Sequence, residues 1–160
     1  MSEPAPIRLL VTEEIARGIR DHGAQGYPNE ACGAMLGVDG ERREVRVLFP
    51  LVNRRDDSPR NRFSVTADDV RAAERAAAKH GLELIGWYHS HPDHPAHPSE
   101  FDREHAWPWY SYVIVSVAQG RPQDMTSWRL ADDRSHYWPE EITAEGSAPP
   151  PKESSARPGG

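Results

Sequence analysis

The pattern of apolar and polar positions along the chain predicts several strands mixed with three helices. Short apolar runs, rich in β-branched and aromatic residues and bounded by turn residues, indicate strands at 7–11, 31–38, 45–52, 82–91, 112–117, 125–130 and 136–138. Capping residues and helical spacing predict helices from Thr12 to about His22, from Thr66 to Lys79, and from Ser99 to about Ala106. Gly23 and Gly26 are expected to end the first helix. The predicted fold class is α/β, with a mixed central sheet flanked by helices.

The pattern also divides the chain into a folded part and a tail. Residues 1–142 are predicted to form a single domain, because a chain of 160 residues fits one domain with its own core. Residues 143–160 are rich in Pro, Ser, Gly and Ala and contain no aromatic residue, so they are predicted to be disordered. Residues 53–62 form a polar loop of mixed charge.

Composition narrows the classes of partner and compartment. The net charge is −6, so the chain lacks the basic footprint of a nucleic-acid-binding protein. No apolar stretch approaches the ~20 residues that a membrane span needs, and the first residues do not read as a signal peptide. Cys32 is the only cysteine, which fits a reducing compartment. The expected location is therefore the cytoplasm.

One segment, HSHPDHPAHPSEFD at residues 89–102, carries candidate chemistry. On an extended strand, His89 and His91 point to the same face and can bind one metal ion. Asp102, eleven residues after His91, can add an oxygen ligand. Three protein ligands leave a fourth tetrahedral position for water, which is typical of a catalytic zinc site. Zinc lowers the pKa of a bound water to about 7 and so makes hydroxide available at neutral pH.

These residues resemble the motif of the JAMM (MPN-plus) metallopeptidase family. The motif is a glutamate in an N-terminal segment, then His-Ser/Thr-His-Pro, then Ser-x-x-Asp; here it corresponds to Glu30 in YPNEACG, to residues 89–92, and to Ser99 with Asp102. The resemblance covers about residues 7–141. It implies a single MPN/JAMM-like domain with deaminase-like topology. The stretch PNEACGAMLG looks like small bacterial and archaeal members that process ubiquitin-like proteins and sulfur carriers at a Gly-Gly terminus.

The resemblance also implies a role for each residue. His89, His91 and Asp102 would bind one zinc ion per chain. Glu30 would take a proton from the attacking water and pass it to the leaving amine, and Ser99 would donate a hydrogen bond to the oxyanion. The implied activity is a zinc metallopeptidase or isopeptidase that cleaves after the Gly-Gly of a ubiquitin-like or sulfur-carrier protein. Neither nucleic acid nor membrane is an expected partner.

Most of these residues also have a structural interpretation. Ser99 and Asp102 match a helix capping box, and we expect one carboxylate to serve either the cap or the metal well, with metal favoured. Glu30 taken alone reads as a solvated loop carboxylate. Ser90 faces away from the histidine ligands and is expected to support them or to pack. Cys32 is expected to be a small buried residue, not a nucleophile.

The remaining histidines and aromatic residues are less specific. His94 and His97 are expected to be solvated in a proline-rich loop, and His105 to pack near the site edge. Trp107, Trp109 and Tyr110 follow the third helix; they either pack in the core or form a hydrophobic shelf for a peptide partner.

Other functions compete with the peptidase. One is a non-catalytic domain that binds partners, and another is metal binding for stability alone. A zinc deaminase also pairs a glutamate with a zinc-bound water, but its Pro-Cys-x-x-Cys signature needs two cysteines and this chain has one. The final Gly159-Gly160 is either the end of a disordered tail or a mimic of a cleaved product.

Overall fold

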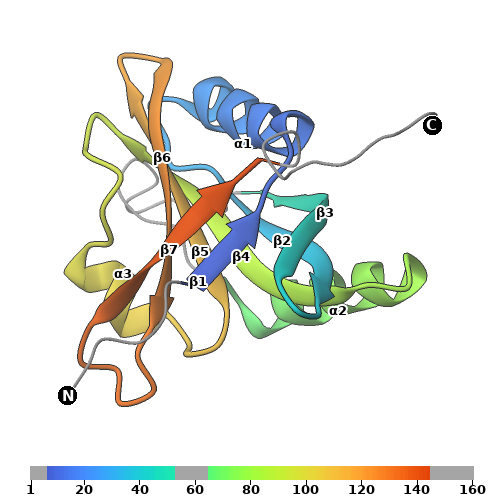
Figure 1. The fold of residues 1–160 in the computed structure, drawn as a ribbon. Helices are drawn as coiled ribbons and strands as arrows, with labels where there is room; N and C mark the ends of the chain where they lie inside the picture. The colour runs from blue at the N-terminus through green and yellow to red at the C-terminus, as the bar shows by residue number, and fades with distance from the viewer. Residues whose placement is uncertain (1–6, 53–64, 145–160) are drawn as a thin grey trace, which may run out of the picture.

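A closed, mixed β-barrel forms the centre of the computed structural model, which describes residues 7–52 and 65–144 (Figure 1). In these residues the strand order around the barrel is β1-β3-β2-β4-β5-β6-β7. The strands are β1 Ile7–Leu10, β2 Cys32–Asp39, β3 Arg43–Leu51, β4 Glu83–Pro92, β5 Ser111–Ala118, β6 Arg121–Leu130 and β7 Tyr137–Thr143. The helices are α1 Glu13–Gly26, α2 Ala67–Lys79 and α3 Glu100–His105. The predicted mixture of strands and helices in one domain is confirmed.

The short strand β1 closes the barrel. It pairs in parallel with β3 through Leu9 and Leu10 and with β7 along its whole length. Strands β4 and β5 are also parallel, whereas the β2–β3, β2–β4, β5–β6 and β6–β7 pairs are antiparallel. The apolar pattern indicated each strand but not this closure, because nothing in a four-residue run shows that it has two partners.

Helix α1 runs four residues further than predicted. It begins at the predicted cap, where the Thr12 hydroxyl accepts a hydrogen bond from the Ile15 amide. It continues through Gly23 to Gly26, so the expectation that Gly23 ends it is wrong. A Cβ at Gly23 would lie 3.2 Å from the Ser90 Cβ and 3.2 Å from a Val117 methyl. The glycine therefore serves close helix–sheet packing, not termination.

Two apolar clusters lie on the two sides of the sheet, and Figure 1 shows α1 and α2 covering different sides of the barrel. Ile19 of α1 packs with Met35 and Tyr88 in one cluster, and Ala73 and Ala77 of α2 pack with Trp87 in the other. Helix α2 begins at the predicted capping box of Thr66 and Asp69. Among the described residues, the helices are too short or too polar to cross a membrane.

Strand β7 ends at Thr143, one residue beyond the predicted boundary at residue 142. The Thr143 carbonyl accepts a hydrogen bond from the Val11 amide. Residues 145–160, including Gly159-Gly160, and the polar loop 53–62 lie outside the described residues.

Candidate active site

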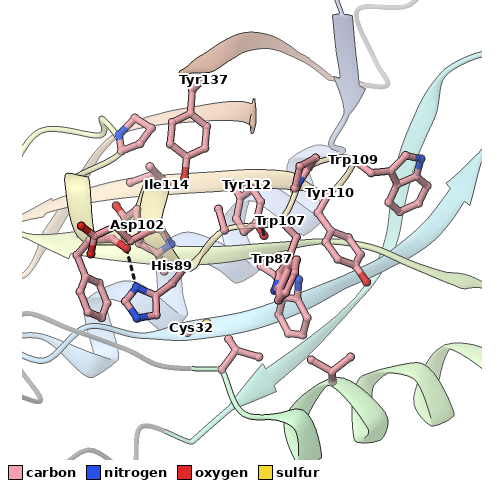
Figure 2. A pocket seen from close by; sticks show the side chains of 18 of the residues that line it. Cys32, Trp87, His89, Asp102, Trp107, Trp109, Tyr110, Tyr112, Ile114 and Tyr137 are labelled. Carbon is pink, nitrogen blue, oxygen red and sulfur yellow. Dashed lines mark hydrogen bonds and ion pairs between the residues drawn. The ribbon is translucent and has the colours of Figure 1, made fainter. Parts of the chain in front are cut away.

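Strand β4 and helix α3 bring the three predicted metal ligands together. His89 and His91 point to one face of β4, with their Nε2 atoms 3.1 Å apart. Asp102 reaches them from the first turn of α3, where its Oδ2 lies 3.1 Å from His91 Nε2 and 3.5 Å from His89 Nε2. Three donor atoms from two elements thus face one point, as Figure 2 shows for His89 and Asp102.

The spacing of these atoms fits a tetrahedral zinc ion. Ligands bound to zinc at ~2.0–2.1 Å in a tetrahedron lie ~3.3 Å from one another, and the three observed separations are 3.1, 3.1 and 3.5 Å. His91 Nδ1 lies 2.9 Å from the Pro95 carbonyl oxygen, which can only accept, so this nitrogen donates. His91 Nε2 is thereby oriented toward the Asp102 carboxylate oxygen, where the two atoms could share a metal ion.

Asp102 serves the helix cap and the ligand cluster together. Its Oδ2 accepts a hydrogen bond from the Ser99 amide at 2.8 Å, and the Ser99 hydroxyl accepts one from the Asp102 amide at 3.1 Å. The same oxygen that caps α3 also faces the two histidines, and it has lone pairs for both contacts. Burial raises the pKa of Asp102, but the His89 and His91 imidazoles and the Ser99 amide together lower it by more. The net pKa of Asp102 therefore lies below the usual range.

Glu30 lies beside this cluster and is not a solvated loop carboxylate. It precedes β2, and only 6% of its surface is exposed. Its carboxylate and the ring nitrogens of His89 and His91 lie within 4.8 Å of one another, so the three residues could also hold a metal. Such a separation leaves Glu30 within reach of a water held between it and the histidines.

Ser90 connects the histidine strand to the glutamate segment. It is buried on the opposite face of β4 from His89 and His91. Its hydroxyl accepts a hydrogen bond from the Ala31 amide at 2.8 Å, and its own amide donates to the Ala31 carbonyl at 2.9 Å. Since Ala31 follows Glu30, these two bonds fix the backbone that carries the carboxylate.

Cys32 is buried and His94 and His97 are exposed, as expected, whereas His105, which was expected to pack, is exposed. Cys32 is buried and pairs with His89 across β2 and β4; burial, and then the charge of Glu30, raise the pKa of its thiol well above the usual value. The thiol therefore stays protonated and is a poor nucleophile. His94 and His97 are exposed. His105 is also exposed, and its Nδ1 bonds to the Phe101 carbonyl within α3.

An aromatic cleft of about 1100 Å³ extends from the ligand cluster (Figure 2). Trp107 and Trp109 line it with 64% and 46% of their surfaces exposed, so these two tryptophans form a shelf and do not pack in the core. Tyr110 packs edge-on against Trp87. The sequence-based prediction missed the three aromatic strand residues that line the cleft, Trp87, Tyr112 and Tyr137. They come from three different strands, and no spacing in the sequence links them.

Tyr137 brings a hydroxyl group to the roof of this cleft. Figure 2 shows its ring pointing from β7 toward the side of Asp102. The ring lies edge-on to Tyr112, with the ring centroids 6.5 Å apart. Burial raises the pKa of Tyr137, and the charges of Asp102 and Tyr112 raise it further. The hydroxyl therefore stays protonated at neutral pH and can donate a hydrogen bond.

This fold and this constellation define a domain of the JAB/MPN class. The family model for prokaryotic homologs of the JAB domain matches residues 12–131, and the chain belongs to this family. The match contains Glu30 and the whole segment from His89 to Asp102.

Relatives of the chain include a desampylase, a peptidase and a protease. A desampylase of Haloferax volcanii is 32% identical over 114 residues, which cover 68% of this chain and 81% of the relative. A CysO-cysteine peptidase of Mycobacterium tuberculosis is 27% identical over 78% of this chain and 84% of the relative. A probable TtuB-protein conjugate cleaving protease of Thermus thermophilus is 34% identical over 68% of this chain and 70% of the relative.

Solved structures share the fold. A protein of Desulfitobacterium hafniense is 34% identical, with a TM-score of 0.74 over 86% of this chain and 92% of its own. A JAB1/MPN domain protein of Archaeoglobus fulgidus is 13% identical, with a TM-score of 0.51 over 88% of this chain and 99% of its own. The second likeness extends to the fold alone.

Proposed function

We propose that this protein is a zinc-dependent metallopeptidase or isopeptidase that hydrolyses the amide bond after the Gly-Gly terminus of a ubiquitin-like or sulfur-carrier protein. The observation that carries the proposal is the convergence of His89 Nε2, His91 Nε2 and Asp102 Oδ2 at separations suited to one zinc ion. The names of the relatives support a carrier protein as the substrate. Cys32, the only cysteine, fits a reducing compartment, so we place the reaction in the cytoplasm.

In this proposal His89, His91 and Asp102 hold the metal. A bound zinc ion supplies Lewis-acid chemistry, because it polarises an amide carbonyl and lowers the pKa of water. Pro95 fixes the ring of His91 through Nδ1, and the Ser99 amide fixes the carboxylate of Asp102. These bonds keep the ligands in place, so the site needs little rearrangement to bind the ion.

Glu30 and Ser99 handle the protons and the developing charge. The Glu30 carboxylate takes a proton from the attacking water and returns it to the leaving amine. The Ser99 hydroxyl oxygen accepts a bond from the Asp102 amide, which leaves its hydrogen available to donate to the oxyanion. Ser90 keeps the Glu30 segment at the strand that carries the histidines.

The experiment compares zinc content and cleavage of a ubiquitin-like carrier extended beyond Gly-Gly. Wild type should contain one zinc per chain and cleave after Gly-Gly. Glu30→Gln should keep the zinc and lose turnover, whereas Asp102→Asn should lose both, since an amide oxygen can still cap α3 but is a weaker ligand. Glu14→Gln, on the exposed side of α1, is the control. Full activity in Glu30→Gln would show that the acid/base assignment is wrong.

The carrier itself offers a second test. Replacing its penultimate glycine by alanine should sharply reduce turnover, because the added Cβ must pass between Glu30 and the metal ligands. An alanine-containing carrier that is cleaved as fast as the natural one would exclude Gly-Gly specificity.

A further inference from the structure

Trp109 combines an exposed ring with an unfavourable backbone conformation. Its φ is +86°, in the region where the Cβ of a non-glycine residue is crowded. Such a conformation is strained for a residue with a Cβ and persists only where its surroundings hold it. Trp109 lines the cleft, and its indole lies at the end away from Asp102 in Figure 2.

The buried Arg43 holds both the backbone and the ring of Trp109. Arg43 begins β3 and is 2% exposed. Its Nη1 donates to the Trp109 carbonyl at 2.6 Å and to the Ser111 hydroxyl at 3.1 Å, and its guanidinium carbon lies 4.1 Å from the Trp109 ring centroid. Its Nε donates to Asp39 at 3.1 Å. The guanidinium of Arg43 therefore holds both the main chain and the indole ring of Trp109 in place.

The register of β4 and β5 sets the distance between Trp109 and the ligand cluster. In this parallel pair Ser111 lies beside Gly86 and Ile114 beside His89. Three strand residues span about 10 Å, and Trp109 precedes Ser111 by two residues. An extended peptide cut beside His89 therefore reaches Trp109 with a side chain at least about three residues from the cleaved bond.

We propose that Trp109, positioned by Arg43, is a specificity-determining contact that binds an apolar side chain in the carrier's tail, upstream of Gly-Gly. The inference rests on the proposed function and names how the same site selects its substrate. The carrier's tail is the part of the substrate that stays the same whether the leaving group is an amino acid, a peptide or a lysine side chain. Tryptophan offers a large rigid surface for such a contact.

Trp109→Gly isolates the ring from the backbone. Glycine adopts a φ of +86° without strain, so this variant removes the indole and lets the main chain stay in place. For the extended carrier, KM should rise at least about tenfold, as for the loss of an aromatic hot spot, with kcat little changed. The control is Trp138→Ala, which removes an exposed tryptophan of β7 that does not line the cleft; it should leave KM and kcat unchanged.

Two further measurements test the contact between Trp109 and the carrier's tail and the support that Arg43 gives to Trp109. Alanine at the apolar tail position of the carrier should raise KM for wild type but not further for Trp109→Gly, since both changes remove the same contact. Arg43→Lys should raise KM with kcat retained, because a lysine ammonium has no planar face to stack on the indole and no second nitrogen to bond Asp39 at the same time. Where Arg43→Lys does not fold, Trp109→Gly decides the matter.

The outcomes separate this inference from the proposed function. Wild type that cleaves the carrier, together with Trp109→Gly that has an unchanged KM, overturns the contact and leaves the peptidase in place; Trp109 would then only cover Arg43. Wild type that neither cleaves nor binds the carrier overturns the proposed function and the contact with it. A raised KM in Trp109→Gly alone supports the contact.

Discussion

Ser99 has two uses for one hydroxyl group, and they can be measured separately. Its oxygen caps α3 by accepting from the Asp102 amide, while its hydrogen is free for the oxyanion in the proposed reaction. Ser99→Ala should lower kcat by about 10²–10³ and stability by about 1 kcal/mol. Thr12→Ala is the matched control, because it removes the equivalent cap of α1 outside the cleft. Equal losses of kcat in the two variants would show that Ser99 acts only as a helix cap.

Cys32 should be unreactive in the folded protein. Burial and the Glu30 charge raise the pKa of its thiol, and only the thiolate is alkylated readily. A raised pKa keeps the thiol protonated through neutral and mildly alkaline pH. We expect no iodoacetamide adduct at pH 7–8 by intact mass spectrometry, and one adduct after denaturation in urea. Rapid labelling of the folded chain would show that the pocket around Cys32 opens.

Sequence-based prediction works best here for residues that are close in the sequence. His89, His91 and Asp102 lie within fourteen residues, and the strand period and helix cap that position them are local rules. The buried environment of Glu30 depends on the Ser90–Ala31 pairing, 59 residues apart in the sequence, so local rules alone left it as a loop carboxylate. Their roles in metal binding and catalysis stay predictions until the zinc and Glu30→Gln measurements are made.

At the scale of elements, α1 shows why a glycine can be read in two ways. Gly18 and Gly23 lie on the same helix, but a Cβ at Gly18 would approach only the end of the Leu48 side chain, at 3.0 Å. A Cβ at Gly23 would meet Ser90, Val115 and Val117 at 3.2–3.3 Å. Both glycines have the same low helix propensity, whereas packing decides what each one does in the fold.

The two glycines therefore give opposite predictions. Gly18→Ala should leave the free energy of unfolding unchanged or raise it by up to about 1 kcal/mol, because alanine favours the helix and Leu48 can move. Gly23→Ala should lower it by about 1–3 kcal/mol through overpacking against β4 and β5. It should also reduce turnover, since Ser90 holds the Glu30 segment. Urea unfolding and the carrier assay measure both effects, and a stabilised Gly23→Ala variant would contradict the packing argument.

At the scale of the whole molecule, barrel closure is what the sequence conceals most completely. The strands were predicted one by one, but β1 joins β3 to β7, which lie far apart in the sequence. The residues that line the cleft come from β2, β4, β5, β7, α2, α3 and the segment after α3, so they meet only once the barrel has closed. Arg43 illustrates this: it reads as a polar residue of a hairpin, but it is one of the most buried side chains described.

The buried carboxylate of Glu140 links several strands of the closed barrel, and the exposed carboxylate of Glu141 provides a control for its removal. Its side chain is fully buried; it accepts hydrogen bonds from Ser127 at 2.6 Å, from Arg129 at 2.8 Å, and from Ser111 at 3.1 Å. The Ser111 hydroxyl also accepts a hydrogen bond from Arg43, so the Glu140 carboxylate links β7 to β5 and β6 directly and to β3 through Ser111. Removing one partner of a buried ion pair leaves the other charge uncompensated.

Glu140→Ala should therefore lower the free energy of unfolding by about 3–5 kcal/mol in urea titrations. Glu141→Ala removes the next carboxylate, which pairs with Arg8 in solvent with more than half of each side chain exposed. Exposed pairs contribute about 0–1 kcal/mol, so this variant should unfold almost as wild type does. Similar losses of unfolding free energy in the two variants would mean that the apolar clusters alone stabilise the barrel. The position of Arg43 beside Trp109 would then not depend on Glu140.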